Sequence, residues 1–319
     1  MMGYSGVASE KERGFILVTV LWALLLLALL AIVATTMFRG SHQALTRADK
    51  LAAARTLADG MARLLVADIA ATRRFRFNGM AMRSGWPIAC RHENAVIVLT
   101  ATNSVGLVDL NLAKREVLKT LLLAGGVTMG EVERLLDAII DFRDPDHLTR
   151  DGQPEDRIYS DRGELHLPKN SPYEDVGELD QVAYMKPRVL ARIRPYLTVY
   201  SRRRTVDFSL SPPKLATMFG GDALDDAQIA TRSAEASRTA RDTASAYHLE
   251  AQYRTFEIRV LVARDDGMQA MRMAGVEMAP GTRDGYRLLY WNRAMSLPHE
   301  RLLAGKNNLP PCFPSLSRE

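Results

Sequence analysis

The longest apolar run of the chain lies near its start and predicts a helix that can cross a membrane. Residues 15–38 carry no charged side chain, and a polar segment with both acids and bases precedes them. At about 1.5 Å per residue the run is about 36 Å long as a helix, whereas the hydrocarbon core of a bilayer is about 30 Å thick. The apolar region of a secretory signal peptide is shorter, about 7 to 15 residues. A single span therefore fits better, and basic residues on both sides leave its orientation open.

The same helix is predicted to continue beyond the membrane run. Apolar residues keep helical spacing from Leu45 to Ile69, and no proline interrupts them. We expect one helix of about 55 residues, whose second half places an apolar stripe on a soluble domain.

Extended, β-branched runs predict a small antiparallel sheet against that stripe. Residues 95–101 form one strand candidate, bounded by asparagines. Three later runs alternate or are separated by turn residues, which favours a meander over residues 253–264, 268–280 and 285–294.

Helical signals between the first strand and the meander predict an inserted, mainly helical domain, so the expected fold class is α+β. Asn111 is a candidate N-cap for a helix that ends at Gly125 and Gly126. Thr128 and Glu131 have the spacing of a capping box for the next helix. Further helix starts are predicted at Asp175 with Glu178, and at Pro187.

A second helix followed by a Gly-Gly pair suggests an internal repeat. The segment VDFSLSPPKLA from Val206 resembles VDLNLAKREVL from Val108, and duplication and chance are about equally good explanations. A helix, a Gly turn and a helix also describe the helix-hairpin-helix unit, whose turn amides can hold phosphate. Arg202, Arg203 and Arg204 could then contact a nucleic-acid backbone, although a charge run is more often a solvated turn. The chain from Gly220 to Ser245 predicts a surface helix or a mobile linker.

Composition excludes several classes of protein. Apolar residues make up 47% and charged residues 25% of the chain, which excludes wholesale disorder. The net charge of +5 suits an anionic surface without demanding nucleic acid. The two cysteines, Cys90 and Cys312, are too few for a disulfide scaffold or a four-thiolate zinc site, but they could form one bridge in an oxidising compartment.

The sequence predicts no catalytic centre. None of the common nucleophile, phosphate-binding or zinc-protease motifs occurs, and the six histidines have no ligand spacing. We therefore expect a binding or structural protein rather than an enzyme.

An acidic stretch is the place where a metal ion is plausible. Carboxylates are dense between residues 141 and 156, in a segment whose prolines and glycine favour a loop. Calcium accepts about 6 to 8 hard oxygen ligands in flexible geometry, although Leu148 and Thr149 exclude an EF-hand. A solvated loop paired with Arg143, Arg150 and Arg157 is the alternative. The candidate ligands are Asp141, Asp144, Asp146, Asp151, Glu155 and Asp156.

The N-terminal layout resembles that of type IV prepilin-like proteins. In that family a short charged leader ending in glycine is removed, which here implies cleavage between Gly14 and Phe15 and N-methylation of Phe15. Most pseudopilins have a glutamate at the fifth mature position, whereas this chain has Thr19. That carboxylate can pair inside lipid with the terminal amine of the subunit above. A subunit without it is best tolerated at the tip of the fibre.

Further segments resemble the minor pseudopilin K family of the bacterial type II secretion system. They are Val20–Ala31, VDLNLAKREVL, DAIIDFRDPD, PKNSPYEDVGELDQV, RPYLTVYS and YRLLYW, in the family's order. The resemblance implies a type IV pilin-like fold in the bacterial inner membrane, with one span and a periplasmic soluble domain that binds calcium. It also implies other minor pseudopilins, prepilin peptidase and the inner-membrane assembly platform as partners, with the secretin or an exported protein as further ones, and no nucleic acid.

The function implied is to initiate and cap the tip of the pseudopilus that exports folded proteins. A membrane-tethered DNA-binding protein, a type IV pilus minor pilin and a plain tethered scaffold are the alternatives. The expected parts are the leader (1–14), the membrane helix (15–38), the periplasmic helix with the first strand (39–101), the inserted domain (102–201), a second helical repeat with a linker (202–250), the meander (251–297) and a tail (298–319).

Overall fold

The computed structural model describes residues 10–163, 167–239 and 254–313; the side chains of residues 10–16, 34–44 and 239 also lie outside the description. The chain divides into two compact units, Met1–Ala53 and Ala54–Glu319. The α+β class expected from the sequence is confirmed, because helices and antiparallel strands share the second unit.

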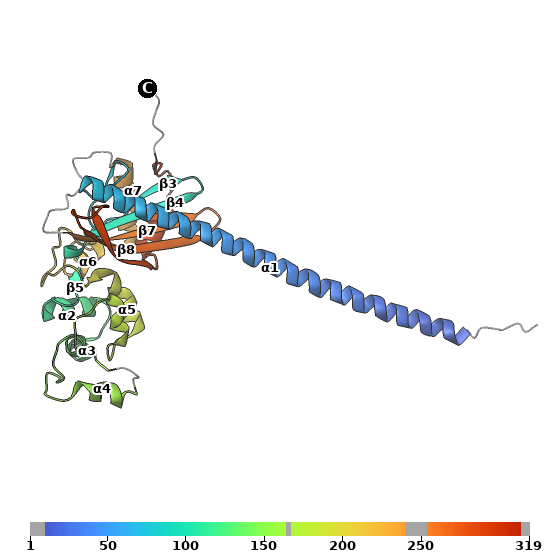
Figure 1. Cartoon of the computed structure of the whole chain (residues 1–319), viewed down its shortest axis with the longest axis horizontal. Helices are drawn as coiled ribbons and strands as arrows, with labels where there is room; N and C mark the ends of the chain where they lie inside the picture. Colours follow the sequence, from blue (N-terminus) through green and yellow to red (C-terminus); the bar gives the residue numbers. More distant parts are fainter. Residues whose placement is uncertain (1–9, 164–166, 240–253, 314–319) are drawn as a thin grey trace, which may run out of the picture. The chain divides into compact units, whose positions relative to one another are not determined.

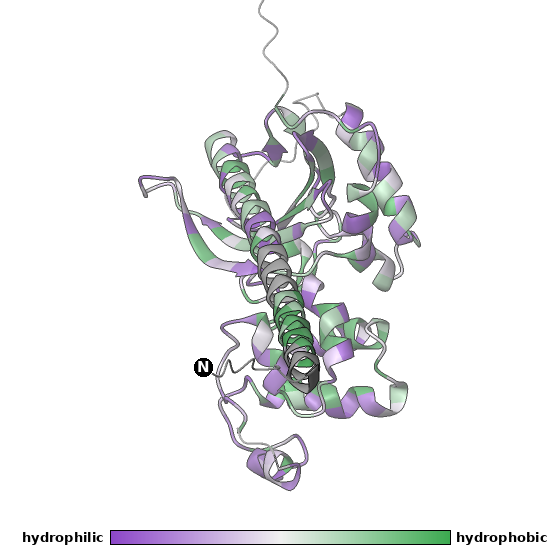
Figure 2. Ribbon diagram, turned by 90° about the vertical axis from the view of Figure 1, so that its right-hand side faces the viewer, coloured by the Kyte–Doolittle hydropathy of each residue, from purple (hydrophilic) through white to green (hydrophobic). Residues whose placement is uncertain are grey.

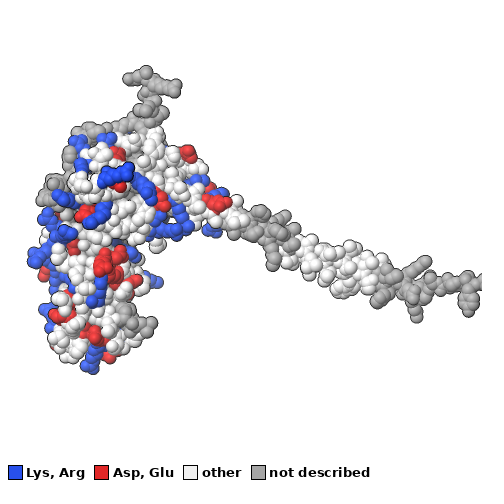
Figure 3. Space-filling view, in the orientation of Figure 1, with Lys and Arg blue, Asp and Glu red and all other residues white. Residues whose placement is uncertain are grey.

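Helix α1 (Glu10–Thr72) confirms the long N-terminal helix. Every described side chain from Leu17 to Val33 is exposed. This stretch is mostly green in Figure 2 and lacks charge in Figure 3. No helix in the described part of the chain is both long and apolar enough to cross a membrane. Both ends of the predicted span, residues 15–38, have side chains outside the description.

The main sheet has five antiparallel strands in the order β3-β4-β7-β8-β9 (Figure 1). The four predicted strands are confirmed. The extra one, β3, is short and carries polar residues at its end, so its pattern was too weak to predict. The bounds are β3 (Ile88–His92), β4 (Ala95–Asn103), β7 (Thr255–Arg264), β8 (Gln269–Met278) and β9 (Tyr286–Arg293).

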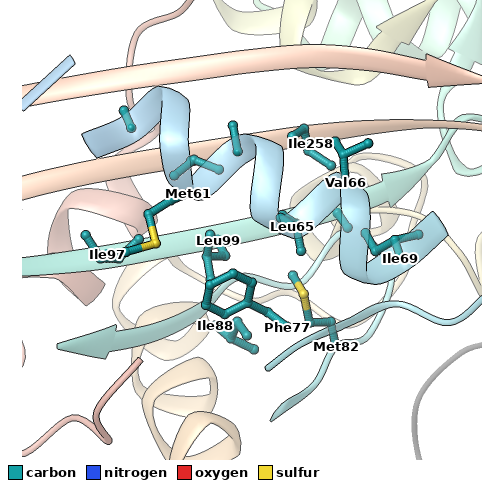
Figure 4. Close-up of a cluster of buried hydrophobic side chains, with 14 of the residues drawn as sticks. Met61, Leu65, Val66, Ile69, Phe77, Met82, Ile88, Ile97, Leu99 and Ile258 are labelled. Atoms are coloured by element: carbon teal, nitrogen blue, oxygen red, sulfur yellow. The ribbon is translucent and has the colours of Figure 1, made fainter. Parts of the chain in front are cut away.

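The second half of α1 packs on one face of this sheet. Met61, Leu65 and Ile69 lie four residues apart, so they project from one side of the helix. Figure 4 shows this side of α1 beside Ile97 and Leu99 of β4, and all five side chains are at most 3% exposed. The predicted contact between helix and sheet is therefore confirmed. Truncating one of these buried aliphatic side chains to alanine would cost about 2 to 5 kcal/mol.

Helices α7 (Asp226–Thr239) and α8 (Pro298–Ala304) cover the opposite face. Ala234 and Leu303 pack against Val96 and Val98, which alternate along β4 with the residues that face α1. For residues 226–239 the surface helix is therefore the correct alternative, while residues 240–253 lie outside the description.

The predicted C-terminal tail, residues 298–319, is not an extra appendage as far as residue 313. Leu303 of α8 is fully buried, and the amide of Cys312 donates to the carbonyl of Arg91 beside the sheet edge. The structure joins Cys90 and Cys312 in a disulfide with a Cα–Cα distance of 4.8 Å. The sequence did not predict this packing, because the segment has only a few apolar residues and they show no regular period. Residues 314–319 lie outside the description.

A helical domain lies between β4 and β7 in the sequence and has its own core. This core includes buried side chains of helices α2 (Arg115–Ala124) and α3 (Met129–Asp141), namely Leu118, Leu122, Leu136 and Ile139. Two short strand pairs, β1 (Arg76–Phe77) with β2 (Met80–Ala81) and β5 (Val108–Asp109) with β6 (Leu197–Thr198), complete the fold. Further helices are α4 (Glu155–Asp161), α5 (Pro187–Ile193) and α6 (Pro213–Met218), with 3-10 turns η1 (Ser104–Gly106), η2 (Val176–Gln181) and η3 (Arg194–Tyr196).

The predicted helix starts of this domain have mixed outcomes. Asp175 and Glu178 form the predicted capping box, although the helix is a 3-10 turn, and Pro187 opens α5. Thr128 is the N-cap of α3, but its hydroxyl donates to the Glu131 carboxylate instead of capping the backbone. The prediction for Asn111 was wrong: α2 begins at Arg115, and Asn111 exchanges two hydrogen bonds with the backbone of Tyr173. A long-range contact thus overrides the local capping signal.

Candidate functional site

Three of the predicted acidic ligands meet between the end of α3 and the start of α4. Asp144 and Asp146 lie in the loop after α3, and Glu155 is the first residue of α4. One carboxylate oxygen from each of them lies within 4.8 Å of the others. The amide of Glu155 donates to the carbonyl of His147, which holds the start of α4 against the loop.

The buried oxygens of this cluster have no hydrogen-bond partners among the described residues. Glu155 is 1% exposed, and neither of its carboxylate oxygens accepts a hydrogen bond. Asp144 Oδ1 and Asn170 Oδ1 are unpartnered as well. Asn170 reaches this loop through its Nδ2, which lies 2.5 Å from Nδ1 of His147. A buried carboxylate without a partner is costly, so the cluster is suited to a cation.

Burial and like charge together raise the pKa values here. The pKa of Glu155 is raised to about 7, first by burial and then by the charges of Asp141, Asp144 and Asp146. The pKa of Asp141, which is 8% exposed, is likewise raised to about 7 by burial and by its acidic neighbours. Burial also raises the pKa of Asp144. A bound divalent cation would favour the ionised form of all these groups.

The structure brings three of the six predicted ligands together. Asp151 and Asp156 are exposed and lie outside the group. Asp141 is near enough to raise the pKa of Glu155 but is not a member of the group. Asn170 was missed as a neighbour of the cluster, because only the fold brings it to the loop.

In the alternative of a solvated loop with arginine partners, the charge of Arg143 acts on Asp144 and opposes the rise of its pKa. Arg143 donates through Nη1 to the carbonyl of Leu110, and Arg157 pairs with Asp161. Carboxylate oxygens are hard donors, and the exposed side chain of Asp146 leaves room for water, which can complete a calcium site. The donor set therefore fits calcium.

The first Gly-Gly turn is closed to phosphate by the chain itself. The amides of Gly125, Gly126 and Val127 all donate to carbonyls at the end of α2. Arg192 donates through Nη1 to the carbonyl of Gly125, and a Cβ on Gly126 would lie 2.6 Å from that nitrogen. With its amides used and an arginine over it, the turn cannot act as a helix-hairpin-helix phosphate cradle. The DNA-binding alternative is not favoured.

The predicted leader sites lie at the start of α1. Gly14 and Phe15 belong to this helix, and the side chain of Phe15 is outside the described part of the chain. Thr19 is described and is exposed on the helix. Cleavage and methylation stay predictions.

Comparisons with known proteins give one family match and similar solved structures. Residues 98–202 match the family described as type II secretion system (T2SS), protein K. A similar solved structure is the GspK-GspI-GspJ complex from the type 2 secretion system of enterotoxigenic Escherichia coli, at 16% identity and a TM-score of 0.47 over 81% of this chain and 99% of that one. A comparison with curated proteins finds no match.

Proposed function

Because residues 98–202 match the type II secretion system protein K family, we propose that the chain is a minor pseudopilin that initiates and caps the tip of a periplasmic pseudopilus. The pseudopilus would export folded proteins across the outer membrane, and the role of this subunit would be structural rather than catalytic. The observation that carries the proposal is the family match over residues 98–202, the helical domain inserted between β4 and β7.

The insertion also supports the end position on steric grounds. Strands β4 and β7 pair along their whole length, from Ala95 with Arg264 to Asn103 with Phe256. The chain leaves the sheet after β4, builds a second core and returns to the adjacent strand. A fibre of close-packed pilin-like subunits has no room along its shaft for a second core of this size, whereas its end is open.

The family implies a periplasmic, membrane-associated protein, and we propose a single inner-membrane anchor in residues 15–38. Leu17, Trp22 and Leu26 are each at least 60% exposed. A continuous apolar surface of this kind is unfavourable in water and marks contact with lipid or with other helices. Thr19 supplies no acid there to pair with a subunit above.

The outer face of α1 would contact the other minor pseudopilins. Thr56, Gly60 and Ala67 recur on this exposed face, and a Cβ added at Gly60 would meet nothing within 4 Å. Glycine inside a helix costs about 1 kcal/mol relative to alanine. Since the fold itself does not need Gly60, close approach of a neighbouring helix is a reason for it to be there.

The substitution Gly60→Leu tests this contact without damaging the fold. It should leave the free energy of unfolding unchanged or raised, while co-purification with the other minor pseudopilins falls. Gly130→Leu is the matched control, because Gly130 also lies in a helix with open space around its Cα. Equal loss of co-purification in both variants would argue against assembly through α1.

We further propose that Asp144, Asp146 and Glu155 hold calcium, with Asn170 as an additional oxygen donor. The ion would neutralise carboxylates that the fold buries and would tie α4 to the loop after α3. The test measures direct binding of calcium to the full chain in detergent. Glu155→Gln should abolish that binding, and Asp151→Asn should leave it unchanged.

Maturation tests the prepilin part of the proposal. The mass and N-terminal residue of the protein should show a chain that begins with methylated Phe15 in a host with prepilin peptidase. In a host without the peptidase the chain should begin at Met1. An intact Met1 in both hosts would overturn this part of the proposal.

A further inference from the structure

The helical domain has a pocket, separate from the acidic loop, with an apolar floor and a cationic rim. It measures about 260 Å³ and lies between α3, the end of α4 and the segment that leads into α5. Val127, Leu135 and Val189 form a floor that is at most 8% exposed. None of the candidate calcium ligands lines it.

Two guanidinium groups converge on one aromatic ring at the rim. The Cζ atoms of Arg134 and Arg162 each lie 4.7 Å from the centre of the Tyr184 ring. The third cation, Lys186, pairs with Glu131 at 2.7 Å, so the lining carries three positive charges and one negative charge. Among the described residues Arg134 has no ion pair. Two like charges gathered on one ring make a local site for an anion.

The backbone at Tyr184 supports a built site rather than a chance gathering. Its φ is +68°, in the left-handed region that a bulky residue rarely adopts. The ring of this residue contacts both arginines, and the adjacent Met185 lines the pocket. Such strain persists where the surrounding fold imposes it, and it clusters at binding sites.

We propose that this pocket binds a peptide segment of a partner polypeptide that has an apolar side chain next to a carboxylate. The floor would take the apolar side chain, and Arg134 and Arg162 would take the carboxylate in charge-assisted hydrogen bonds. A bare phosphate or a nucleic-acid backbone fits less well, because it has no apolar group for the floor. The inference rests on the pocket alone and does not depend on the proposed function.

The test follows the methyl signal of Met185, which lines the pocket, in the full chain in detergent. The protein is labelled with ¹³C-methyl methionine, and the Met185→Leu variant assigns the signal. The probes are N-acetyl-phenylalanine, its neutral amide and inorganic phosphate. The dipeptide acetyl-Phe-Asp-amide carries the acid on a side chain and so separates a side-chain carboxylate from a chain end.

The signal should shift and saturate with N-acetyl-phenylalanine or with the dipeptide, and the neutral amide should bind about tenfold more weakly, since hydrogen bonds to charged groups are the stronger ones. Arg134→Gln should weaken binding by a similar factor. Arg188→Gln is the control, because Arg188 is exposed on α5 but does not line the pocket. Thermal unfolding shows whether each variant is folded.

Three results would overturn the proposal. They are the absence of a saturable shift up to the solubility limit of the probes, an equal response to the acid and its amide, and a response to phosphate as strong as that to N-acetyl-phenylalanine. The last would indicate a general anion site.

Discussion

The sheet region buries charges in pairs, whereas the helical domain buries carboxylates that have no hydrogen-bond partner among the described residues. Arg259 of β7 and Glu300 of α8 are at most 6% exposed and lie 3.0 Å apart, and Tyr290 donates to Glu257. In the acidic loop, neither carboxylate oxygen of Glu155 has a hydrogen-bond partner within the described part of the chain. The sheet region therefore balances this buried charge within the protein, whereas a bound cation would balance the charge of the acidic loop.

The largest effect should follow from breaking the buried pair of the sheet region. Glu300→Ala would remove the carboxylate that pairs with Arg259 in the interior and should lower the free energy of unfolding by about 3 to 5 kcal/mol. Glu277→Ala breaks the exposed pair with Arg287 and should cost at most about 1 kcal/mol. Urea unfolding measures both. Similar losses of unfolding free energy in the two variants would show that the buried pair stabilises the fold no more than the exposed pair does.

The disulfide should come next. It joins residues 222 positions apart and fastens the C-terminal segment to β3. The double variant Cys90→Ser, Cys312→Ser should lose about 2 to 4 kcal/mol of stability, and reduction of the unmodified protein should lose as much. Hydrogen exchange should rise around β3 and residues 305–313 but not in α2 and α3. Faster exchange in those helices instead would show that the two regions are not independent.

Removal of calcium should destabilise the helical domain and not the sheet. At about 100 times its dissociation constant calcium should stabilise the protein by about 2.7 kcal/mol. Chelation should therefore increase hydrogen exchange at α3, α4 and the loop between them, and leave β4 and β7 unchanged. Asp151→Asn should respond to chelation as the unmodified protein does, and Glu155→Gln should not respond. An identical melting curve with and without chelator would contradict the proposal that the protein binds calcium.

The dependence of stability on pH should be smaller than its dependence on calcium, because water reaches part of the acidic loop. The folded-state pKa values of Asp141 and Glu155 are about 7, above their ordinary values of 3.8 and 4.5. Without calcium, the folded state keeps protons that the unfolded state has lost between these limits, so stability should fall as pH rises toward 7. Thermal unfolding across this window checks the sign. Calcium should remove the fall, since its ligands must be deprotonated.

Sequence reasoning performed best where a pattern was local and long. The periodicity of α1 and the alternation of β7, β8 and β9 predicted these elements within a few residues. It failed where a distant contact decides the structure. Asn111 binds the backbone of Tyr173 and does not cap α2, and the C-terminal segment packs on the sheet although its few apolar residues gave no period.

The candidate metal site could be predicted only as a region. The acids between residues 141 and 156 indicated where a cation would bind, but spacing could not separate the gathered carboxylates from the exposed Asp151 and Asp156. That selection depends on where α4 begins, which places Glu155 against the loop. The pocket beside Tyr184 had no sequence signal, because its lining comes from three separate segments.

The position of the protein in the pseudopilus distinguishes a tip subunit from a shaft subunit. An antibody against the helical domain can be visualised by electron microscopy on pseudopili sheared from cells. A tip subunit should give label at one end of each fibre and none along its length. Label spaced regularly along the shaft would show that the protein does not cap the fibre.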